Sequence, residues 1–296
     1  MSIYVENFNL KFTKDILKGK YNNFVTNTIE TPLMDKSKKL TLKNKFKIYF
    51  QLKFIIFDNK LIGYIRYENL SDFFININEI SIDSNYIEEI LKSNLSLNEM
   101  FSNKVVYYEG FDNKGLDKLL LKLGLFINNK SLLKSLDLKD FNYSYKDKSP
   151  FLDISTFVKG KDETLRCDLQ NEIFNDPSRI PLNKEDIILD QKQDYYLKDF
   201  SIFLKYKGKP IGYGQIIKFH NSYMIVNLGV LDMYRGKGLG KYLIERLLYL
   251  AKEKNITKIF IRVDIENNIA LNLYNNLGFK YIDTITFYKN KKTNLV

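Results

Sequence analysis

The segment from Arg235 to Lys241 has the composition of an anion-binding turn. It reads Arg-Gly-Lys-Gly-Leu-Gly-Lys, and it joins an apolar stretch with strand character to a stretch with helical periodicity. Glycine lets backbone N–H groups approach an anion without interference from a Cβ atom, and the dipole of the following helix adds a favourable potential. The side chains of Arg235, Lys237 and Lys241 can contact further phosphate oxygens. We therefore expect a phosphate group to bind here.

Two common phosphate-binding motifs do not fit this segment. A Walker loop needs a glycine five residues before Gly240 and a Ser or Thr after Lys241, but the chain has Arg235 and Tyr242 at these places. The dinucleotide fingerprint fits Gly236 and Gly238, yet Lys241 stands in place of its third glycine. Nucleotide sites of these two types are thus excluded.

The elements around the turn alternate between strand and helix. Strand patterns cover residues 201 to 206, 211 to 219, 223 to 230, 258 to 263 and 279 to 288, with hairpin turns at residues 207 to 209 and 220 to 222. A helix from about Lys237 to Lys254 has an apolar stripe at helical spacing, and a short helix covers Asn268 to Asn276. The alternation predicts the α/β class, with helices packed on a mixed α+β sheet.

The two halves of the chain follow one plan. Residues 62 to 64 (Ile-Gly-Tyr) come after a turn at residues 58 to 60, as residues 211 to 213 (Ile-Gly-Tyr) come after their turn. Residues 112 to 125 likewise match residues 266 to 279. The hydrophilic segment from Lys139 to Pro150 is typical of a linker. We predict two domains, residues 1–145 and residues 150–296.

The second half resembles the GNAT superfamily of N-acetyltransferases. A strand, then Arg-x-x-Gly-x-Gly, then a helix is similar to the pyrophosphate-binding loop of that family, and Val230 precedes Arg235 at the family's distance. A second segment agrees with the family's next signature, with residues Asn267, Ala270, Tyr274, Gly278 and Phe279. The resemblance covers about Lys205 to Tyr288, so the whole chain resembles a tandem GNAT protein with a degenerate first half.

The resemblance implies a reaction and a set of site residues. Acetyl-CoA would donate its acetyl group directly to an amine of a small molecule or a peptide, without an acyl-enzyme and without a metal. Tyr274 would be the general acid that protonates the departing CoA thiolate. The implied cofactor-binding residues are Leu228, Gly229 and Val230 along the pantetheine arm, Arg235, Gly236, Lys237, Gly238, Leu239, Gly240 and Lys241 at the pyrophosphate, and Asn267 near the thioester.

The general base stays open. Many family members have a glutamate on the strand before the loop, but residues 223 to 230 contain no carboxylate, and Asn227 cannot accept a proton from an ammonium group. A chain of water molecules or a carboxylate from another element must do this work, the candidates being Glu172, Asp168 and Asp264. We expect no catalytic role for His220, in a hairpin turn, or for Cys167, on an apolar-periodic helix.

The first half lacks the residues that make the second half a cofactor site. In the matching register Ile87 replaces Arg235, and the carboxylates of Glu88 and Glu89 would repel a pyrophosphate. Leu120 stands where Tyr274 stands in the second half. We expect the first domain to keep the fold, to bind no acetyl-CoA, and to serve as a structural partner or as part of the acceptor pocket.

Composition restricts the remaining function classes. The chain has 46 Lys and Arg against 35 Asp and Glu, a net charge of +11, but the excess is spread thinly and forms no basic block. A nucleic-acid-binding module is therefore the weakest hypothesis, and an acyl-CoA-binding sensor without transfer activity is the main alternative to an enzyme. The apolar stretches are too short for a membrane span, and one cysteine excludes an intrachain disulfide. We expect a cytoplasmic protein, whose acceptor and oligomeric state the sequence does not specify.

Overall fold

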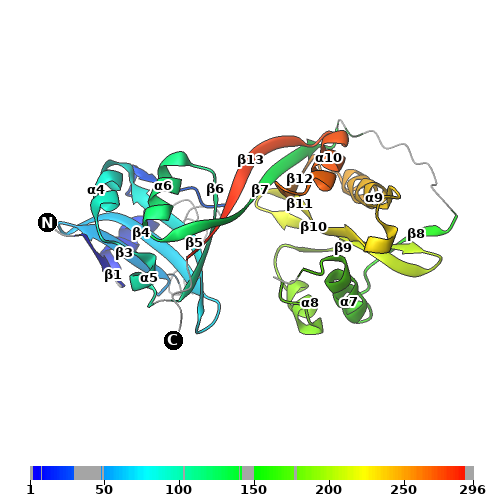
Figure 1. Ribbon diagram of the computed structural model, residues 1–296, viewed down its shortest axis with the longest axis horizontal. Coiled ribbons are helices and arrows are strands. Elements are labelled where there is room, and N and C mark those ends of the chain that lie inside the picture. Colours follow the sequence, from blue (N-terminus) through cyan, green and yellow to red (C-terminus); the bar gives the residue numbers. More distant parts are fainter. Residues whose placement is uncertain are drawn as a thin grey trace. The chain divides into compact units, whose positions relative to one another are not determined.

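Contacts divide the chain into two compact units. The computed structural model describes residues 3–7, 9–29, 48, 50–102, 104–139, 141, 150–176 and 179–290. The first unit is Met1–Ser131 with Asp283–Val296, and the second is Leu132–Ile282. These bounds differ from the expected 1–145 and 150–296, because strands β7 (Leu125–Asp137) and β13 (Lys280–Asn290) each contribute residues to both units (Figure 1). Most of the expected linker, residues 140 and 142–149, lies outside the described residues.

The second unit is a sheet covered by helices on both faces. After β7 the sheet order is β12, β11, β10, β9 and β8. Figure 1 shows α7 and α8 on one face of this sheet and α9 on the other. The elements are β8 (Leu152–Thr156), α7 (Glu163–Ile173), α8 (Lys184–Asp190), β9 (Tyr196–Tyr206), β10 (Lys209–Phe219), β11 (Ser222–Val230), α9 (Leu239–Glu253), β12 (Lys258–Asp264) and α10 (Asn268–Asn276).

The long helix α9 forms because its sequence presents one apolar face to the sheet. Leu243, Ile244, Leu247 and Leu248 are fully buried in the core of the second unit. Gly214 of β10 allows the helix to approach closely, because a Cβ atom there would lie 2.8 Å from Cδ1 of Leu247. The sequence predicted this helix within two residues at its start and one at its end.

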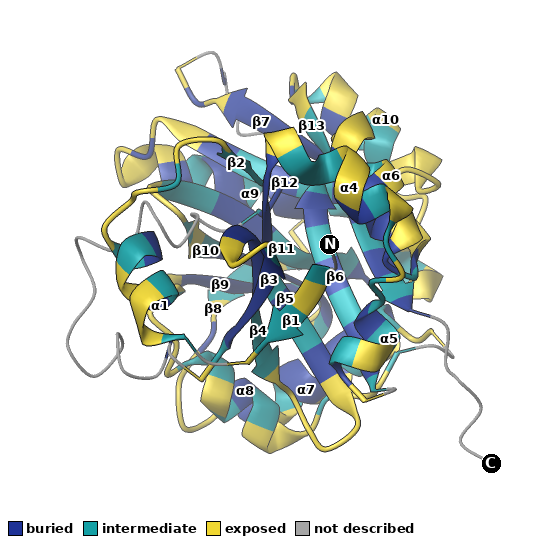
Figure 2. Cartoon of the chain, turned by 90° about the vertical axis from the view of Figure 1, so that its left-hand side faces the viewer, coloured by how far each residue is buried: buried dark blue, intermediate teal, exposed yellow. Residues whose placement is uncertain are grey.

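The first unit repeats the arrangement with shorter helices. Its strand order is β1, β3, β4, β5, β6 and β13, with β2 paired to β5. Figure 2 shows its central strands β3, β4 and β5 mostly buried and the outer surfaces of its helices exposed. The elements are β1 (Ile3–Glu6), α1 (Leu10–Leu17), β2 (Phe24–Val25), β3 (Leu52–Phe57), β4 (Lys60–Asn69), β5 (Phe74–Asp83), α4 (Ile87–Lys92), α5 (Leu97–Met100), β6 (Val105–Phe111) and α6 (Lys114–Lys122).

Matching residues of the two halves form the same local structures. Asn113 caps α6 by accepting hydrogen bonds from Gly115 N and Leu116 N, and Asn267 caps α10 by accepting one from Ala270 N. The predicted hairpin turns also form, with left-handed residues at 58–59 and 207–208. The expected α/β class, with helices on a mixed sheet in each of two similar units, is confirmed.

Candidate active site

A gap opens between β11 and β12. The two strands pair in parallel over only three residue pairs, which end at Ile225 and Ile261, whereas β11 continues to pair with β10 as far as Val230. A bulge in β11 accompanies the divergence, and within it Asn227 has a left-handed φ of 54°. Beyond Ile225, β11 therefore has an edge toward β12 along which an extended ligand can add as a strand.

A cavity of about 310 Å³ lies in this gap. It brings together Leu228, Asn267 and Tyr274, three residues expected at the site from sequence. The remaining lining residues are Phe174, Arg179, Ile225, Val226, Asn227, Ile261, Arg262, Val263, Asp264 and Ala270. Two strands, one helix and the segment after α7 thus meet at one place.

Tyr274 is a buried phenol facing this cavity. Its side chain is 7% exposed, and burial raises the pKa of its hydroxyl to about 12. Within the described part of the chain, its hydroxyl has no hydrogen-bond partner. Asn267 uses Oδ1 as the cap of α10, at 3.0 Å from Ala270 N, and its Nδ2 group has no partner among the same residues. Both polar groups are in a position to contact a ligand.

The turn before α9 is open to an anion. Gly236 and Gly238 have φ values of 74° and 72°, which only glycine adopts readily. Gly238 is the N-cap of α9 and offers no side-chain cap, and the first turn of the helix has no acidic residue. The space in front of Gly236 and Gly240 is empty, since a Cβ atom on either would have no neighbour within 4 Å. The start of α9 thus has no side-chain cap and no acidic residue in its first turn, and the residues present fit a pyrophosphate.

The basic side chains of this turn differ in their roles. Arg235 donates from Nε to Val230 O (3.2 Å) and from Nη2 to Ile173 O (3.0 Å), and it pairs with Asp232 at 2.7 Å. Its guanidinium therefore holds the loop against the end of α7. Lys237 donates to Met233 O, while Lys241 is exposed and lies 3.8 Å from Glu245. The two lysines remain the side chains that can turn toward a phosphate.

Gly229 explains how α7 can approach β11. A Cβ atom on Gly229 would collide with Cγ2 of Ile173 and press against the ring of Phe174. The end of α7 thus lies directly on the bulged part of β11, and it places Phe174 at the cavity. An expected cofactor contact of Gly229 is confined to its backbone.

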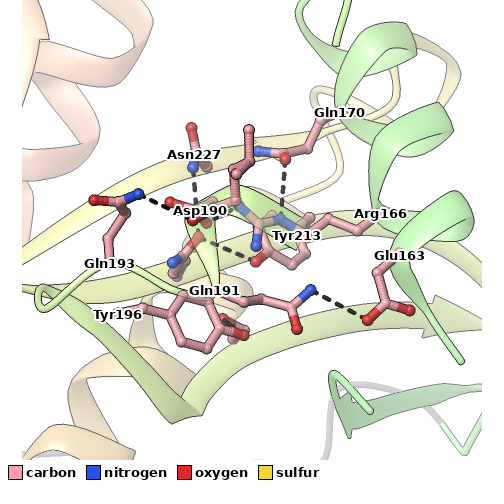
Figure 3. Close-up of polar contacts among 12 residues, drawn as sticks. Glu163, Arg166, Gln170, Asp190, Gln191, Gln193, Tyr196, Tyr213 and Asn227 are labelled. Carbon is pink, nitrogen blue, oxygen red and sulfur yellow. Dashed lines mark hydrogen bonds and ion pairs between the residues drawn. The ribbon is translucent and has the colours of Figure 1, made fainter. Parts of the chain in front are cut away.

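A network of buried polar side chains holds the bulge of β11 through Asn227. Asn227 donates from Nδ2 to Oε1 of Gln215, which also accepts a hydrogen bond from the Tyr213 hydroxyl (Figure 3). The guanidinium of Arg166 stacks on the Tyr213 ring at 5.1 Å and donates to Gln170 and Asp190. These contacts join α7, α8, β10 and β11. They therefore fix the position of β11, the strand that borders the gap.

The structure separates the three candidate carboxylates. Asp264 lines the cavity that holds Tyr274, and its Oδ1 accepts a hydrogen bond from Glu266 N at 2.8 Å. Glu172 lines a separate cavity of about 340 Å³ next to Arg235. Asp168 is exposed on α7 and lines neither cavity. Asp264 is therefore the carboxylate that the fold brings to Tyr274.

Two residues that the sequence gave no role stay outside the cavity. His220 is exposed in the turn between β10 and β11, where its ring contacts Phe219. Cys167 is buried on α7, donates to Leu182 O, and has its thiol pKa raised by burial. Neither side chain lines the cavity of Tyr274.

In the first unit a segment of the chain itself enters the corresponding gap. Strands β5 and β6 pair in parallel over four residues and end at Ile77 and Tyr108. The segment after β2 enters beyond this point: Asn27 O accepts from Phe111 N at 2.7 Å, and Thr28 Oγ1 donates to Asn78 O at 2.6 Å. Gly110 makes the room, because a Cβ atom there would lie 2.7 Å from Asn27 Nδ2.

The strand carboxylate missing from the second unit has a counterpart in the first. In the matching register Glu79 stands where Asn227 stands, three residues before Ile82 and Val230 respectively. Glu79 is fully buried, accepts a hydrogen bond from the Tyr64 hydroxyl at 2.5 Å, and pairs with Arg66 at 3.4 Å. Its charge is balanced inside the core of the first unit.

Sequence reasoning gave no role to two cavity residues that follow α7, and it named Asn227 without recognising the bulge. Phe174 and Arg179 follow α7, and nothing in their local sequence ties them to a strand 50 residues later. Asn227 did carry a signal, since it interrupts an apolar strand, and asparagine is among the few residues that tolerate a left-handed backbone. Reading it as a bulge would have located the gap.

Within the described ranges, no group of three or more His, Cys, Asp and Glu side chains is arranged to hold a metal ion. Across those same ranges, none of the helices has both the length and the apolar character that crossing a bilayer needs.

Comparison with known proteins agrees with the geometry. The model of the "Acetyltransferase (GNAT) family" matches residues 167–279. The chain is 39% identical over 61 residues to the probable N-acetyltransferase san of Drosophila melanogaster, covering 20% of this chain and 33% of that protein. It is 26% identical over 189 residues to mycothiol acetyltransferase of Amycolatopsis mediterranei, covering 60% of this chain and 62% of that protein. The chain thus spans less than two thirds of the length of these curated relatives.

Solved structures show the same fold over both units. A GCN5-related N-acetyltransferase from Sphaerobacter thermophilus has a TM-score of 0.68 at 13% identity, covering 97% of this chain and 95% of the other. A tandem GNAT protein from the clavulanic acid biosynthesis pathway has a TM-score of 0.59 at 9% identity, covering 100% and 99%. The chain therefore carries a domain of the GNAT acetyltransferase family over residues 167–279, within a tandem of two GNAT-like units.

Proposed function

We propose that the second unit transfers the acetyl group of acetyl-CoA directly to a primary amine of a small molecule or a peptide. The observation that carries this proposal is the combination, within one unit, of the strand gap beside β11, the uncapped start of α9 and the buried phenol of Tyr274. The pantetheine arm would lie along Leu228–Val230, and the pyrophosphate would lie at Gly236–Lys241.

The reaction needs one acid and one proton acceptor. The amine nitrogen attacks the thioester carbonyl, the C–N bond forms, and the C–S bond breaks with its electron pair on sulfur. Tyr274 would give its proton to the CoA thiolate, and Asn267 would orient the thioester end of the cofactor arm. Because burial keeps the pKa of Tyr274 near 12, this residue holds its proton at neutral pH until the thiolate forms.

Asp264 is the carboxylate in place to accept the proton from the attacking amine, directly or through one water molecule. It lines the same cavity as Tyr274. Asp264→Asn should therefore lower turnover most at low pH, where the ammonium form of the acceptor dominates, and should leave acetyl-CoA affinity unchanged.

We further propose that each chain binds one acetyl-CoA. In the first unit, Asn27 and Thr28 occupy the space between β5 and β6 in which a cofactor arm would have to lie. The helix that follows β5 there, α4, has six residues with Glu88 and Glu89 in its first turn, which disfavours an anion.

The test is a screen of primary amines with acetyl-CoA, read by the release of free CoA thiol and by the mass of the acetylated product. The proposal expects thiol release that depends on both the amine and the intact chain. If acetyl-CoA binds but no amine in a broad panel becomes acetylated, the second candidate function applies, an acyl-CoA-binding sensor without transfer activity. The observation in favour of that candidate is Asn227, which stands at the bulge where a strand glutamate would act as base.

A further inference from the structure

One wall of the cavity comes from the segment after α7. Phe174 and Arg179 both line the space that Tyr274 faces. The guanidinium carbon of Arg179 lies 5.0 Å from the centre of the Phe174 ring, and both side chains are half-buried. The ring therefore holds the positive charge of Arg179 at the wall of the cavity.

The charge of Arg179 lacks a carboxylate partner. No carboxylate among the described residues lies within ion-pair distance of its guanidinium, which contacts the Phe174 ring. By contrast, the guanidinium groups of Arg66, Arg166 and Arg235 each pair with a carboxylate. A half-buried arginine that keeps its hydrogen-bond donors free inside a ligand cavity is well suited to bind an anion.

The chemistry of the cavity determines which anion fits. The Asp264 carboxylate is also present, with Oδ1 already bonded to Glu266 N, so the cavity offers a negative group for an ammonium and a positive group for an acid. The planar guanidinium fork matches the two oxygens of a carboxylate. A molecule with both charges would place its amine toward Asp264 and Tyr274 and its carboxylate toward Arg179.

We propose that the acceptor is a primary amine that also carries a carboxylate, and that Arg179 is the residue that selects it. This inference rests on the proposed acetyl transfer and names the class of acceptor for that site. The carboxylate could belong to a free amino acid or to an acidic side chain near the start of a peptide, and the two sources share the same recognition.

The experiment compares matched acceptors on the full chain. Each free amino acid is assayed beside its carboxamide, and a peptide with an acidic second residue beside the same peptide with the amide residue. The wild-type protein should prefer the carboxylate member of a pair in kcat/KM. Arg179→Gln should lower kcat/KM for that member about ten- to a hundredfold, mainly through KM, and leave the amide member unchanged. The pair whose carboxylate member loses more kcat/KM in Arg179→Gln shows whether the carboxylate belongs to a free amino acid or to a peptide.

Two controls separate binding from folding and from the cofactor. Lys207→Gln removes the same charge from an exposed turn outside the cavity and should leave the preference intact. The affinity of Arg179→Gln for acetyl-CoA should equal that of the wild type. Equal losses on both members of a pair, or a wild-type preference for the amides, would overturn the role of Arg179 while the transferase proposal stands. Failure to acetylate any amine overturns both.

Discussion

Nη2 of Arg235 donates a hydrogen bond to the backbone oxygen of Ile173, which is 62 residues earlier in the chain and 3.0 Å away. Nε of the same side chain donates to Val230 O. One guanidinium thus joins the end of α7, the end of β11 and the loop before α9. The arginine that begins the glycine-rich turn acts as a positioning residue, because Nε and Nη2 hydrogen-bond backbone oxygens of two other segments.

Arg235→Lys tests whether Arg235 acts through its hydrogen bonds or through its positive charge alone. The substitution keeps the charge but loses the planar fork, so we expect a lower melting temperature and about tenfold weaker acetyl-CoA binding, measured by differential scanning fluorimetry and calorimetry. Lys237→Gln is the control. It removes a charge from the same turn and should weaken binding without changing the melting temperature. An Arg235→Lys protein with wild-type stability and affinity would contradict the positioning role.

Gly240→Ala separates stability from binding. Gly240 is the second residue of α9, its φ is not positive, and a Cβ atom there would meet open space. Alanine should therefore stabilise the free protein by about 0.5–1 kcal/mol, yet weaken acetyl-CoA binding at least tenfold because its methyl group enters the phosphate site.

The matched control is Gly115→Ala, at the second residue of α6 in the first unit. A Cβ atom there has only an ordinary contact, 3.5 Å from Asn113 Oδ1. It should give a similar gain in stability and no change in acetyl-CoA affinity. If both variants bind the cofactor equally well, the start of α9 is not the pyrophosphate site.

Tyr274→Phe should lower kcat about a hundredfold and leave the affinity for acetyl-CoA within a factor of two, because the hydroxyl is needed only when the thiolate leaves. Steady-state kinetics and calorimetry measure the two quantities. Tyr281→Phe, at an exposed position on β13, should change neither. Unchanged turnover in Tyr274→Phe removes this residue from the reaction.

The pH profile gives an independent check on the same residue. An acid catalyst works only while it is protonated, so its activity is lost as pH rises through its pKa. Burial raises the pKa of Tyr274 to about 12, above the value of about 10 for a free tyrosine. We therefore expect kcat to stay level between about pH 8 and pH 10. A decline of kcat with an apparent pKa at or below about 10, in a protein that is still folded, argues for another acid.

Asn27→Ala tests the segment that enters the gap of the first unit. Asn27 Nδ2 donates to Phe111 O, and its Oδ1 accepts from the Tyr108 hydroxyl, so the alanine removes two hydrogen bonds and the packing of a buried side chain. We expect a loss of about 2–4 kcal/mol in the free energy of unfolding, measured with urea. The exposed neighbour Asn22 serves as a control, since Asn22→Ala should change stability by less than about 0.5 kcal/mol. A variant as stable as the wild type would mean that the segment only rests on the surface of β6.

Local sequence patterns predicted many of the helices and turns of this fold. The stripe of α9, the asparagine caps at 113 and 267 and the hairpin turns each depend on residues close in sequence, and all were predictable. The bounds of the two units were not, because they depend on how the long strands β7 and β13 divide between units. The insertion of Asn27 beside Phe111 escaped prediction for a related reason, since it joins segments 84 residues apart.

The residues of the candidate site also fall into a predictable group and a group that depends on tertiary contacts. Leu228, Asn267 and Tyr274 could be placed by motif spacing, and the structure brings them to one cavity. Arg235 was expected to contact phosphate, and its carbonyl partners at Val230 and Ile173 depend on tertiary contacts that spacing does not encode. The choice of Asp264 over Glu172 and Asp168 likewise required the orientation of α7 relative to β12.

Calorimetric titration of the full chain with acetyl-CoA tests the central claim most directly. We predict one molecule bound per chain, with affinity reduced at least tenfold by Gly240→Ala and retained by Tyr274→Phe. The absence of binding heat with acetyl-CoA at several temperatures, or two equivalent molecules bound per chain, would contradict the assignment of the β11–β12 gap and the start of α9 as the one cofactor site.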